Sequence, residues 1–416
     1  MINKIKSWLY QFLRRTQKYT GTDNVYLAKG GSWLTLSRTG ALFISLGLGI
    51  IWANFVPKEI YGQYKFILSL AGILAIFSLQ GMKSATVRAV SRNFDGTIKL
   101  ILKTKLRWSA LILLAGFALA VYYWLNDNQV LALSFLIVGF LSPIINSFSI
   151  YGEYLLGKKR FDLGSQYTLI RNFLTAAVII TAIFLTKNVI YIILTYFIAS
   201  SILSIFFYFL TLKKIPPSQN VDQKTISYGK HLSLIGIIGT IGGQIDKILI
   251  FHYLGAIELA IYSFAVVLPD YIGETTRTLK HLALPKLSVK DDQEIKKTIR
   301  PKVIRYGLFL AGAVVLYIIF ADLVFKLFFP AYMDSVFYSR IYAIAVLGNI
   351  TFLPRLSFVA KAKTKTLYTY DTTLNIINIL ILFISLYFFG LLGIIVGRVI
   401  SSFISIPIAF FLFQRS

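Results

Sequence analysis

Charged side chains inside long apolar runs are the residues of this sequence that could do chemistry. Arg398 lies about seven residues into such a run, roughly 10 Å from its start at a helical rise of about 1.5 Å per residue. A charge in hydrocarbon is costly, so it faces a cavity, pairs with another charge or reaches the membrane interface. Because the interface is far from this position, we expect Arg398 to line a cavity or to form an ion pair.

Two opposite charges stand side by side in another apolar run. Asp246 and Lys247 are adjacent, and adjacent residues do not share a helix face. One of them is expected to point inward and the other toward a neighbouring helix, and both a functional site and a structural ion pair fit this pattern. Gly236, Gly239 and Gly243 precede them at three- and four-residue spacing, which suits close helix packing or a flexible gate.

Four further cations lie near the ends of predicted spans. Arg38 and Arg171 are about one turn inside one side of the membrane, and Lys65 and Arg340 are near the other side. Each taken alone fits a long side chain that reaches the interface. Taken together they indicate cationic groups at both mouths of a path. The candidate substrate-contacting cations are therefore Arg398, Lys247, Arg38, Lys65, Arg340 and Arg171.

Acidic residues in the apolar runs are few. Asp270 and Glu274 are four residues apart, so they share a helix face, within reach of Arg277. A local charge pair and a proton or cation site are both open readings of this spacing. Together with Asp246, they are the candidates for ion coupling.

Signals of enzyme, metal or nucleotide chemistry are absent from the sequence. With no cysteine, disulfides, thiolate metal sites and cysteine nucleophiles are excluded, and His231, His252 and His281 lie far apart. Residues 152–159 approach a nucleotide-binding loop, but Lys159 replaces the required hydroxyl and an apolar helix precedes the motif. We expect no catalytic residues, no metal site and no cofactor.

The elements that position these charges are predicted to be transmembrane helices. The chain of 416 residues is 56% hydrophobic and 14% charged, whereas soluble domains carry about 25% charged residues. Its apolar runs approach the ~20 residues that cross a bilayer. This predicts an all-α, polytopic membrane protein with about twelve spans by the apolar-run rule, at 35–56, 62–81, 106–125, 130–150, 168–186, 189–212, 231–252, 257–275, 304–325, 336–354, 373–390 and 391–412.

Charges in the loops indicate how these spans are oriented. Lys and Arg number 43 against 17 Asp and Glu, a formal net charge of +26, and the excess gathers in alternate loops. Because cytoplasmic loops collect Lys and Arg, the basic loops are predicted to be cytoplasmic, as are both termini. The excess is explained by this rule and by anionic lipid, so no nucleic acid partner is expected.

The chain is predicted to consist of an N-terminal amphipathic helix followed by two halves. Residues 1–29 place apolar side chains at helical spacing among lysines and arginines, which predicts a cytoplasmic helix lying on the membrane. The Pro-containing loop 213–230 then separates residues 30–212, with six spans, from residues 231–416, with six more. A faint repeat aligns Tyr64 with Tyr262 after equivalent hairpins, which supports the division.

Several short motifs of the chain are similar to those of a known protein family. The motifs are Phe55-Val56-Pro57-Lys58-Glu59-Ile60-Tyr61-Gly62-Gln63-Tyr64, Gln244-Ile245-Asp246-Lys247-Ile248-Leu249-Ile250, Leu254-Gly255 with Ile261-Tyr262-Ser263, and Leu284-Pro285-Lys286-Leu287. With them the chain resembles the polysaccharide transporters, of the O-antigen (Wzx-like) flippase type, in the multidrug/oligosaccharidyl-lipid/polysaccharide exporter superfamily. The resemblance implies two six-helix lobes around a central cavity and alternating access.

The resemblance and the charges together favour one function. We expect a flippase that moves undecaprenyl-diphosphate-linked oligosaccharide, for O-antigen, capsule or a related glycan, across a bacterial inner membrane, because Arg and Lys suit phosphate oxygens. Its partners would be this polyprenyl diphosphate, membrane lipids and possible polysaccharide polymerase and chain-length proteins. A multidrug or cation antiporter of the same superfamily is the alternative, and a structural scaffold without transport is a third.

Overall fold

Helices make up every regular element of the part of the chain that the structure describes. The structure is a computed structural model and describes residues 24–289, 292–361 and 363–415. The prediction of an all-α protein is confirmed. Most of the predicted amphipathic segment, residues 1–23, lies outside the described residues, and residues 24–29 open the first described helix.

The first half of the chain contains eight α-helices and a short 3₁₀ helix in the described residues. In order they are α2 (Asn24–Phe55), α3 (Lys58–Leu74), η1 (Ala75–Ser78), α4 (Met82–Ser91), α5 (Thr97–Leu125), α6 (Gln129–Phe148), α7 (Tyr151–Gly157), α8 (Phe161–Leu185) and α9 (Val189–Lys214).

The second half begins after a connection of residues 215–223, which is shorter than the predicted loop 213–230. Its described elements are α10 (Lys224–Ile235), α11 (Ile237–Gly242), α12 (Ile245–Tyr253), α13 (Ala256–Val289), α14 (Asp292–Phe328), η2 (Pro330–Tyr332), α15 (Ser335–Ala345), η3 (Val346–Thr351), α16 (Phe352–Ala360) and α17 (Thr364–Arg415).

Ten helical stretches of the described chain are long and apolar enough to cross a membrane. The protein is therefore a multi-pass membrane protein, as predicted. One of the ten stretches is most of α17, in which Gly390 has the non-helical angles φ 56° and ψ −134° and reverses the chain. Glycine adopts such a positive φ without the steric cost of a Cβ. The two predicted spans at 373–390 and 391–412 lie on either side of this residue.

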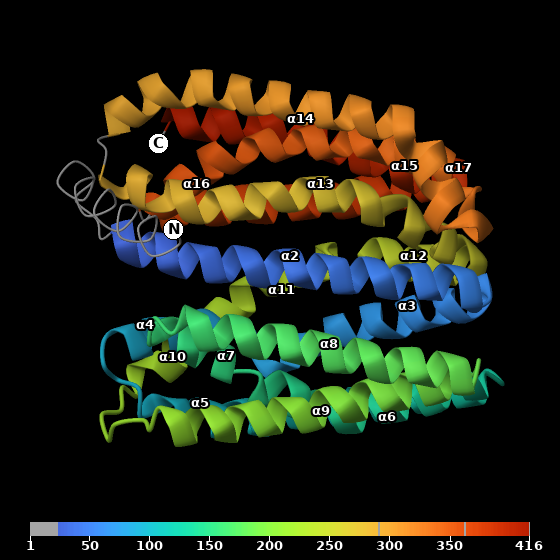
Figure 1. The fold of residues 1–416 in the computed structure, drawn as a ribbon, viewed down its shortest axis with the longest axis horizontal. Coiled ribbons are helices and arrows are strands. Elements are labelled where there is room, and N and C mark those ends of the chain that lie inside the picture. Colours follow the sequence, from blue (N-terminus) through green and yellow to red (C-terminus); the bar gives the residue numbers. More distant parts are fainter. Residues whose placement is uncertain (1–23, 290–291, 362, 416) are drawn as a thin grey trace, which may run out of the picture.

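The predicted span at 231–252 is a bent path of three short helices instead of one straight helix. It changes direction between α10 and α11, at Gly236, and again between α11 and α12, at Gly243 and Gln244. In Figure 1 these helices run from the lower bundle, where α10 packs on α4, to the upper one, where α12 lies beside α3 and α13. The glycine series thus coincides with two bends.

The helices run side by side between two ends of the molecule. At the left of Figure 1 lie α4, α7, α10 and residues 215–223, which we name the linker end; at the right lie the turns after α2, α5, α8 and α12, which we name the hairpin end. Helices α4 to α9 occupy the lower part of the view and α13 to α17 the upper part, with α2 and α3 between them. Large apolar side chains are exposed on the outer helices, as lipid contact requires, among them Phe117, Phe173, Phe209, Leu316, Phe320 and Phe388.

At the linker end, a buried carboxylate holds the connection between the halves. Asp95 accepts hydrogen bonds from the Ser218 amide at 3.0 Å and the Ser218 hydroxyl at 2.6 Å, and pairs with Lys158 at 2.7 Å. Burial by itself would raise the pKa of Asp95, but the hydrogen bonds from Lys158 and Ser218 outweigh it and lower the pKa to about 2. The segment 215–223 is therefore tied to the first half.

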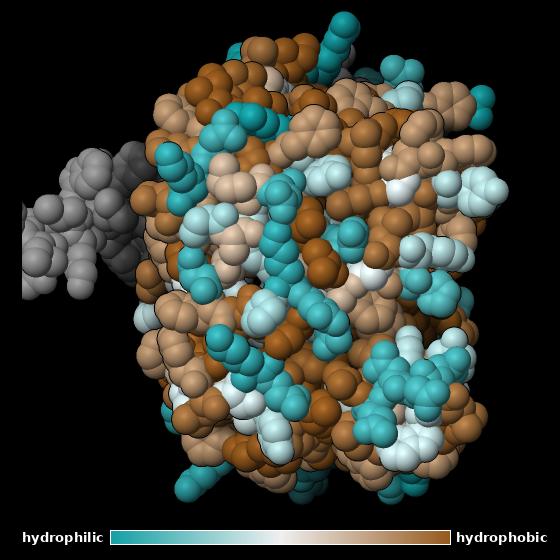
Figure 2. Space-filling view, turned by 90° about the vertical axis from the view of Figure 1, so that its right-hand side faces the viewer, coloured by the Kyte–Doolittle hydropathy of each residue, from teal (hydrophilic) through white to brown (hydrophobic). Residues whose placement is uncertain are grey.

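At the hairpin end, the two halves are in direct contact. A Cβ on Gly62 of α3 would lie 1.8 Å from the carbonyl oxygen of Ala256 at the start of α13, so the backbones touch here. Lys58 pairs with Asp334 at 2.7 Å, and the Asn54 amide donates to the Phe328 carbonyl at 3.0 Å. Figure 2 looks onto this end and shows side chains filling it without a wide opening.

Buried aromatic rings lie directly behind these contacts. Tyr61 packs against Trp52 with ring centroids 5.2 Å apart, against Phe264 at 4.9 Å and against Tyr332 at 6.3 Å. All four side chains are buried, and they come from both halves of the chain. Aromatic pairs at such distances stabilise beyond their buried area by about 0.5–1.5 kcal/mol each. The hairpin end is therefore closed by a joint aromatic core.

Candidate functional site

Three cavities are lined by four of the nine charged side chains singled out from the sequence. The interface cavity, about 120 Å³, lies between α2, α3 and α13 and includes Lys65, Tyr61 and Tyr271. The N-half cavity, about 240 Å³, lies among α2, α3, α8 and α9 and includes Arg171, Asn172 and Tyr196. It shares Ser45, Leu48 and Tyr64 with the interface cavity, so the two adjoin.

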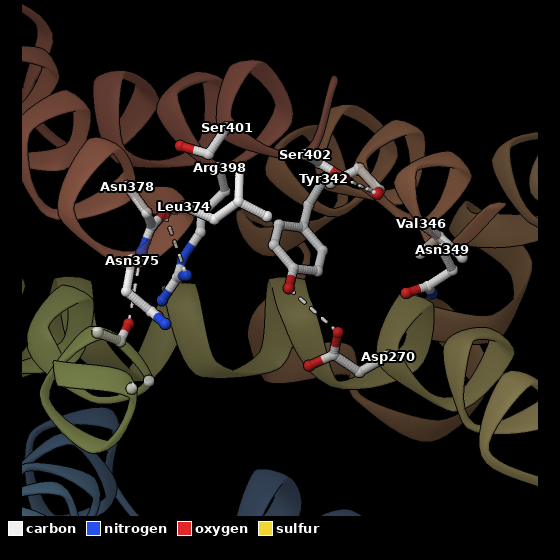
Figure 3. Close-up of a pocket in the computed structure, with 14 residues that line it drawn as sticks. Asp270, Tyr342, Val346, Asn349, Leu374, Asn375, Asn378, Arg398, Ser401 and Ser402 are labelled. Atoms are coloured by element: carbon white, nitrogen blue, oxygen red, sulfur yellow. Dashed lines mark hydrogen bonds between the residues drawn. The ribbon is translucent and has the colours of Figure 1, made fainter. Parts of the chain in front are cut away.

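The third cavity, the C-half cavity, lies inside the second half of the chain. It has a volume of about 360 Å³ and lies among α11, α13, α15, η3 and both arms of α17. Helix α13 separates it from the interface cavity, because Asp270 lines one and the adjacent Tyr271 lines the other. Figure 3 shows the side chains that converge on it from these helices.

Lys65 is a cation without an acidic partner. Its ammonium nitrogen lies 5.2 Å from the centre of the Tyr61 ring, and it forms no ion pair with the residues that the structure describes. Its half-buried side chain lines the interface cavity. An ammonium held against a ring keeps its charge available to an anion that enters the cavity.

Arg171 is the cation of the N-half cavity. It comes from α8 and is half-buried, and it too forms no ion pair within the described part of the chain. Tyr64 and Tyr196, whose ring centroids are 6.4 Å apart, line the same space. The two adjoining cavities thus combine two unpaired cations with phenol hydroxyls, and both kinds of group donate hydrogen bonds to phosphate oxygens.

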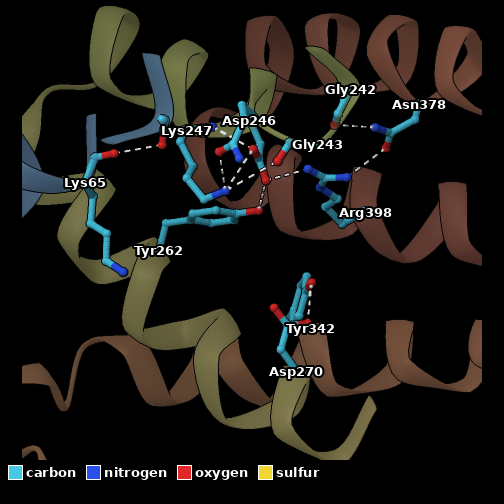
Figure 4. Close-up of polar contacts among 12 residues, drawn as sticks. Lys65, Gly242, Gly243, Asp246, Lys247, Tyr262, Asp270, Tyr342, Asn378 and Arg398 are labelled. Atoms are coloured by element: carbon cyan, nitrogen blue, oxygen red, sulfur yellow. Dashed lines mark hydrogen bonds and ion pairs between the residues drawn. The ribbon is translucent and has the colours of Figure 1, made fainter. Parts of the chain in front are cut away.

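Arg398, by contrast, is paired. Its guanidinium donates to the Asp246 carboxylate at 2.5 Å, and the Tyr262 hydroxyl donates to the same oxygen at 2.5 Å (Figure 4). The side chain of Asp246 is only 4% exposed. The Arg398 guanidinium also reaches the Asn378 amide oxygen at 3.4 Å. The structure therefore brings Arg398 and Asp246 together as a buried ion pair that also lines the C-half cavity.

Lys247 approaches the same carboxylate on its other oxygen (Figure 4). Its ammonium group donates to the Gln244 side chain at 3.2 Å and lies 3.9 Å from the second oxygen of Asp246. Its side chain is 25% exposed. The charge of Asp246 is shared between Lys247 and Arg398, so it is compensated inside the protein.

The other two acidic candidates lie one helical turn apart on α13. Asp270 accepts a hydrogen bond from the Tyr342 hydroxyl at 3.1 Å and is exposed in the C-half cavity (Figure 3). Glu274 is half-buried and is engaged in an interaction, and it does not line the three cavities. The structure does not describe the side chain of Arg277.

Arg38 and Arg340 lie outside the three cavities. Arg38 lines a separate groove of about 320 Å³ between α2, α7 and α8, toward the linker end. Arg340 donates to Asp322 of α14 at 2.5 Å and to the Ile318 carbonyl at 3.1 Å, which joins α15 to α14. Arg340 thus binds two helices of the same half together.

Two further buried charges were not singled out from the sequence. Lys105 of α5 is fully buried, and its ammonium group donates to the Ser78 carbonyl at 2.7 Å where η1 ends. Arg355 of α16 forms two parallel hydrogen bonds to Asp371 of α17, at 2.9 and 2.8 Å. Lys105 follows Lys99 and Lys103, so the sequence reads as a basic loop and gave no sign of a buried charge. Arg355 and Asp371 are 16 residues apart, and no local sequence pattern predicts that they pair. In the described residues, no group of three His, Cys, Asp or Glu side chains could hold a metal ion.

A set of membrane-spanning helices that encloses cation-lined cavities is the architecture of a membrane transporter. The chain belongs to the family described as polysaccharide biosynthesis protein, whose sequence model matches residues 27–269. The family resemblance noted in the sequence is thereby confirmed. A search among curated proteins found no match.

Solved structures of similar fold include a lipid flippase and multidrug transporters. The lipid II flippase MurJ in an inward closed conformation is 15% identical, with a TM-score of 0.72 over 91% of this chain and 86% of that one. Two multidrug resistance MATE transporters of the MOP superfamily are each 12% identical. The outward-facing one has a TM-score of 0.65 and covers 94% of each chain, and the inward-facing one has 0.66 and covers 90% of this chain and 94% of that one. The chain therefore has the fold of this superfamily.

Proposed function

We propose that this protein is a flippase for undecaprenyl-diphosphate-linked oligosaccharides, which it carries from the cytoplasmic to the outer leaflet of a bacterial inner membrane. The observation that carries the proposal is the pair of unpaired cations, Lys65 and Arg171, in adjoining cavities between the helices. The membership in a polysaccharide biosynthesis family supports it. A lipid diphosphate would supply the anionic partner that these two side chains do not have among the described residues.

Electrostatics favours an anionic substrate over a cationic one. Fixed positive charges in a cavity of low dielectric attract anions and repel cations. Asp246, which a cation would need, already holds Arg398 and Tyr262. An outward step of two negative charges also gains roughly 4–5 kcal/mol at 100 mV, at about 2.3 kcal/mol per charge, because the cytoplasm is negative.

We further propose twelve crossings in two lobes. Counting the arms of α17 separately and adding the bent path of α10 to α12 brings the ten apolar stretches to twelve. The lobes are residues 30–212 and 231–416. The linker end is then cytoplasmic, since its loops are basic, and both termini lie on that side.

Alternating access is the mechanism that we propose, and contacts at the hairpin end would form its outer gate. The hairpin end is closed by the contact of Gly62 with Ala256 and by the pair Lys58–Asp334. Rocking of the lobes would break these contacts and release the head group outward, while the lipid tail stays in the bilayer. Polysaccharide polymerase and chain-length proteins would act on the delivered unit.

Deleting the gene tests the proposal. We expect lipid-linked repeat units to accumulate on the cytoplasmic leaflet and surface glycan to fall, with sensitivity to cationic dyes unchanged. The alternative, a drug or cation antiporter, is favoured by the exposed Asp270 and by the MATE structures, and it predicts the reverse pattern. Normal surface glycan in a deletion strain without a second flippase would rule out the proposal.

A further inference from the structure

The C-half cavity has a different chemistry from the two cation-lined cavities. Its lining is rich in amides and hydroxyls, which come from η3 and both arms of α17: Asn349, Asn375, Asn378, Ser401 and Ser402. Gly239, Gly242 and Gly243 of the bent path also line it, and the side chain of Asn375 lies against Gly242. A volume of about 360 Å³ lies at the lower end of the ~300–1,000 Å³ that is usual for small-molecule sites.

Several polar groups in this cavity lack a partner within the described protein. The Ser401 hydroxyl is buried without a hydrogen bond. Asn375 donates to the Asp371 carbonyl, which leaves its amide oxygen free, and Asp270 bonds Tyr342 through only one oxygen. Buried polar groups in proteins are nearly always hydrogen-bonded, so the open Ser401 hydroxyl, beside the half-buried Asn375 and the exposed Asp270, indicates a polar ligand.

The charge balance of the cavity identifies the kind of ligand. Arg398 and Lys247 share the carboxylate of Asp246, and Asp270 supplies a second carboxylate, so the cations and carboxylates in and beside this cavity balance and a neutral ligand fits best. The hydroxyl groups of a sugar both donate and accept hydrogen bonds. They can therefore donate to the carboxylate and bond both the oxygen and the nitrogen of the amide side chains in this cavity. A phosphate or a uronic acid would meet the like charge of Asp270.

We propose that the C-half cavity binds the sugar part of the lipid-linked substrate, and that it takes neutral or amino sugars. The inference rests on the proposed function and adds that different cavities bind the diphosphate and the sugar. Lys65 and Arg171 take the diphosphate in the interface and N-half cavities, and the oligosaccharide extends from there around α13, so that a sugar beyond the first one lies in the amide cavity.

Binding to the purified full-length protein tests this division. The probes are undecaprenyl diphosphate without sugar and the lipid-linked repeat unit extracted from the deletion strain. The native tryptophans report binding by fluorescence. The variants are Ser401→Ala and Asn375→Leu, and the matched control is Ser405→Ala, one turn further along α17, where the hydroxyl bonds the Ser402 carbonyl outside the cavity.

We expect each cavity variant to weaken binding of the repeat unit about 3- to 10-fold, as the loss of one hydrogen bond predicts. Binding of the bare lipid stays unchanged, which also shows that the variant is folded. The control should bind both probes normally. Equal effects of a variant on both probes, or none on either, would overturn the sugar site and leave the flippase proposal standing.

Failure of the proposed function gives a different result. In that case the deletion strain accumulates no repeat unit, or the wild-type protein binds neither lipid. A separate readout is the composition of the extracted unit by mass spectrometry. A repeat unit in which every sugar beyond the first is a uronic acid would contradict the role assigned to Asp270.

Discussion

At the scale of single residues, the intramembrane charges fall into two physical classes. Arg398 and Arg340 are cations whose charge is met by a carboxylate at 2.5 Å. Lys65 and Arg171 line cavities without forming an ion pair in the described structure. Only charges of the second class are available to a substrate, so the two classes should respond differently to substitution.

Lys65 provides the first test. Lys65→Met keeps the length of the side chain but removes the charge, and we expect glycan export to fall about 10- to 100-fold, as loss of a charge-assisted hydrogen bond predicts. Lys65→Arg should retain part of the activity. Arg340→Gln is the matched control, because that cation joins α15 to α14, and its export should stay near normal once abundance is corrected. Export that is equal in Lys65→Met and wild type would remove Lys65 from the path.

Arg398 provides the second test, and here stability is the readout. Arg398→Ala leaves Asp246 buried without its main partner, which costs about 3–5 kcal/mol for a buried pair. We expect the variant to lose abundance and to melt earlier in detergent. Adding Asp246→Asn should restore much of the lost stability, since no unpaired charge then remains. An Arg398→Ala protein as stable as wild type would contradict the ion pair.

At the scale of elements, glycines decide where helices approach and bend. Gly62 allows α3 to touch the start of α13, and Gly236 and Gly243 stand at the bends of the α10–α12 path. The bends carry the chain from one bundle to the other and place Gly239 and Gly242 on the C-half cavity. The two hairpins that the sequence repeat aligned therefore meet at the hairpin end.

A methyl group at Gly62 should loosen the hairpin end. In Gly62→Ala the new Cβ would overlap the Ala256 carbonyl, which is backbone and cannot rotate away. Because the chain has no cysteine, Ser45→Cys in the interface cavity gives a single thiol. We expect faster labelling of this thiol from the outer side in Gly62→Ala. Gly47→Ala is the control, since nothing lies within 4 Å of its new Cβ. Equal labelling of all three proteins would show that this contact is not part of the gate.

At the scale of the whole molecule, the arrangement of the two ends gives the direction of transport that we propose. The basic loops and the linker are at one end, and the contacts Gly62–Ala256 and Lys58–Asp334 between the halves are at the other. A substrate made in the cytoplasm would enter at the linker end and leave when the hairpin end opens.

This orientation is testable with two single cysteines. Asn128→Cys lies in a turn of the hairpin end, and Gln219→Cys lies in the exposed connection at the linker end. An impermeant thiol reagent should label only Asn128→Cys in cells with a permeabilised outer membrane, and both after lysis. Labelling of Gln219→Cys in intact inner membranes would invert the proposed topology.

The sequence alone determined the class of the protein. Apolar runs near the length of a bilayer crossing and motifs such as Gly62 with Tyr64 are local properties, so they predicted a multi-pass helical protein and its family correctly. Hydrocarbon tolerates few charges, which made the intramembrane residues conspicuous in the sequence.

Only the tertiary structure decided what each charge does. Arg398 and Asp246 are 152 residues apart, and their pairing depends on the reversal at Gly390 and on the bend before α12. Arg340 and Lys65 were both predicted to lie near the same side of the membrane. In the structure Arg340 pairs with the carboxylate of Asp322, whereas Lys65 lines a cavity. The physical reason is that the cost of a buried charge depends on its neighbours in space, and those neighbours are set by helix packing between distant parts of the chain.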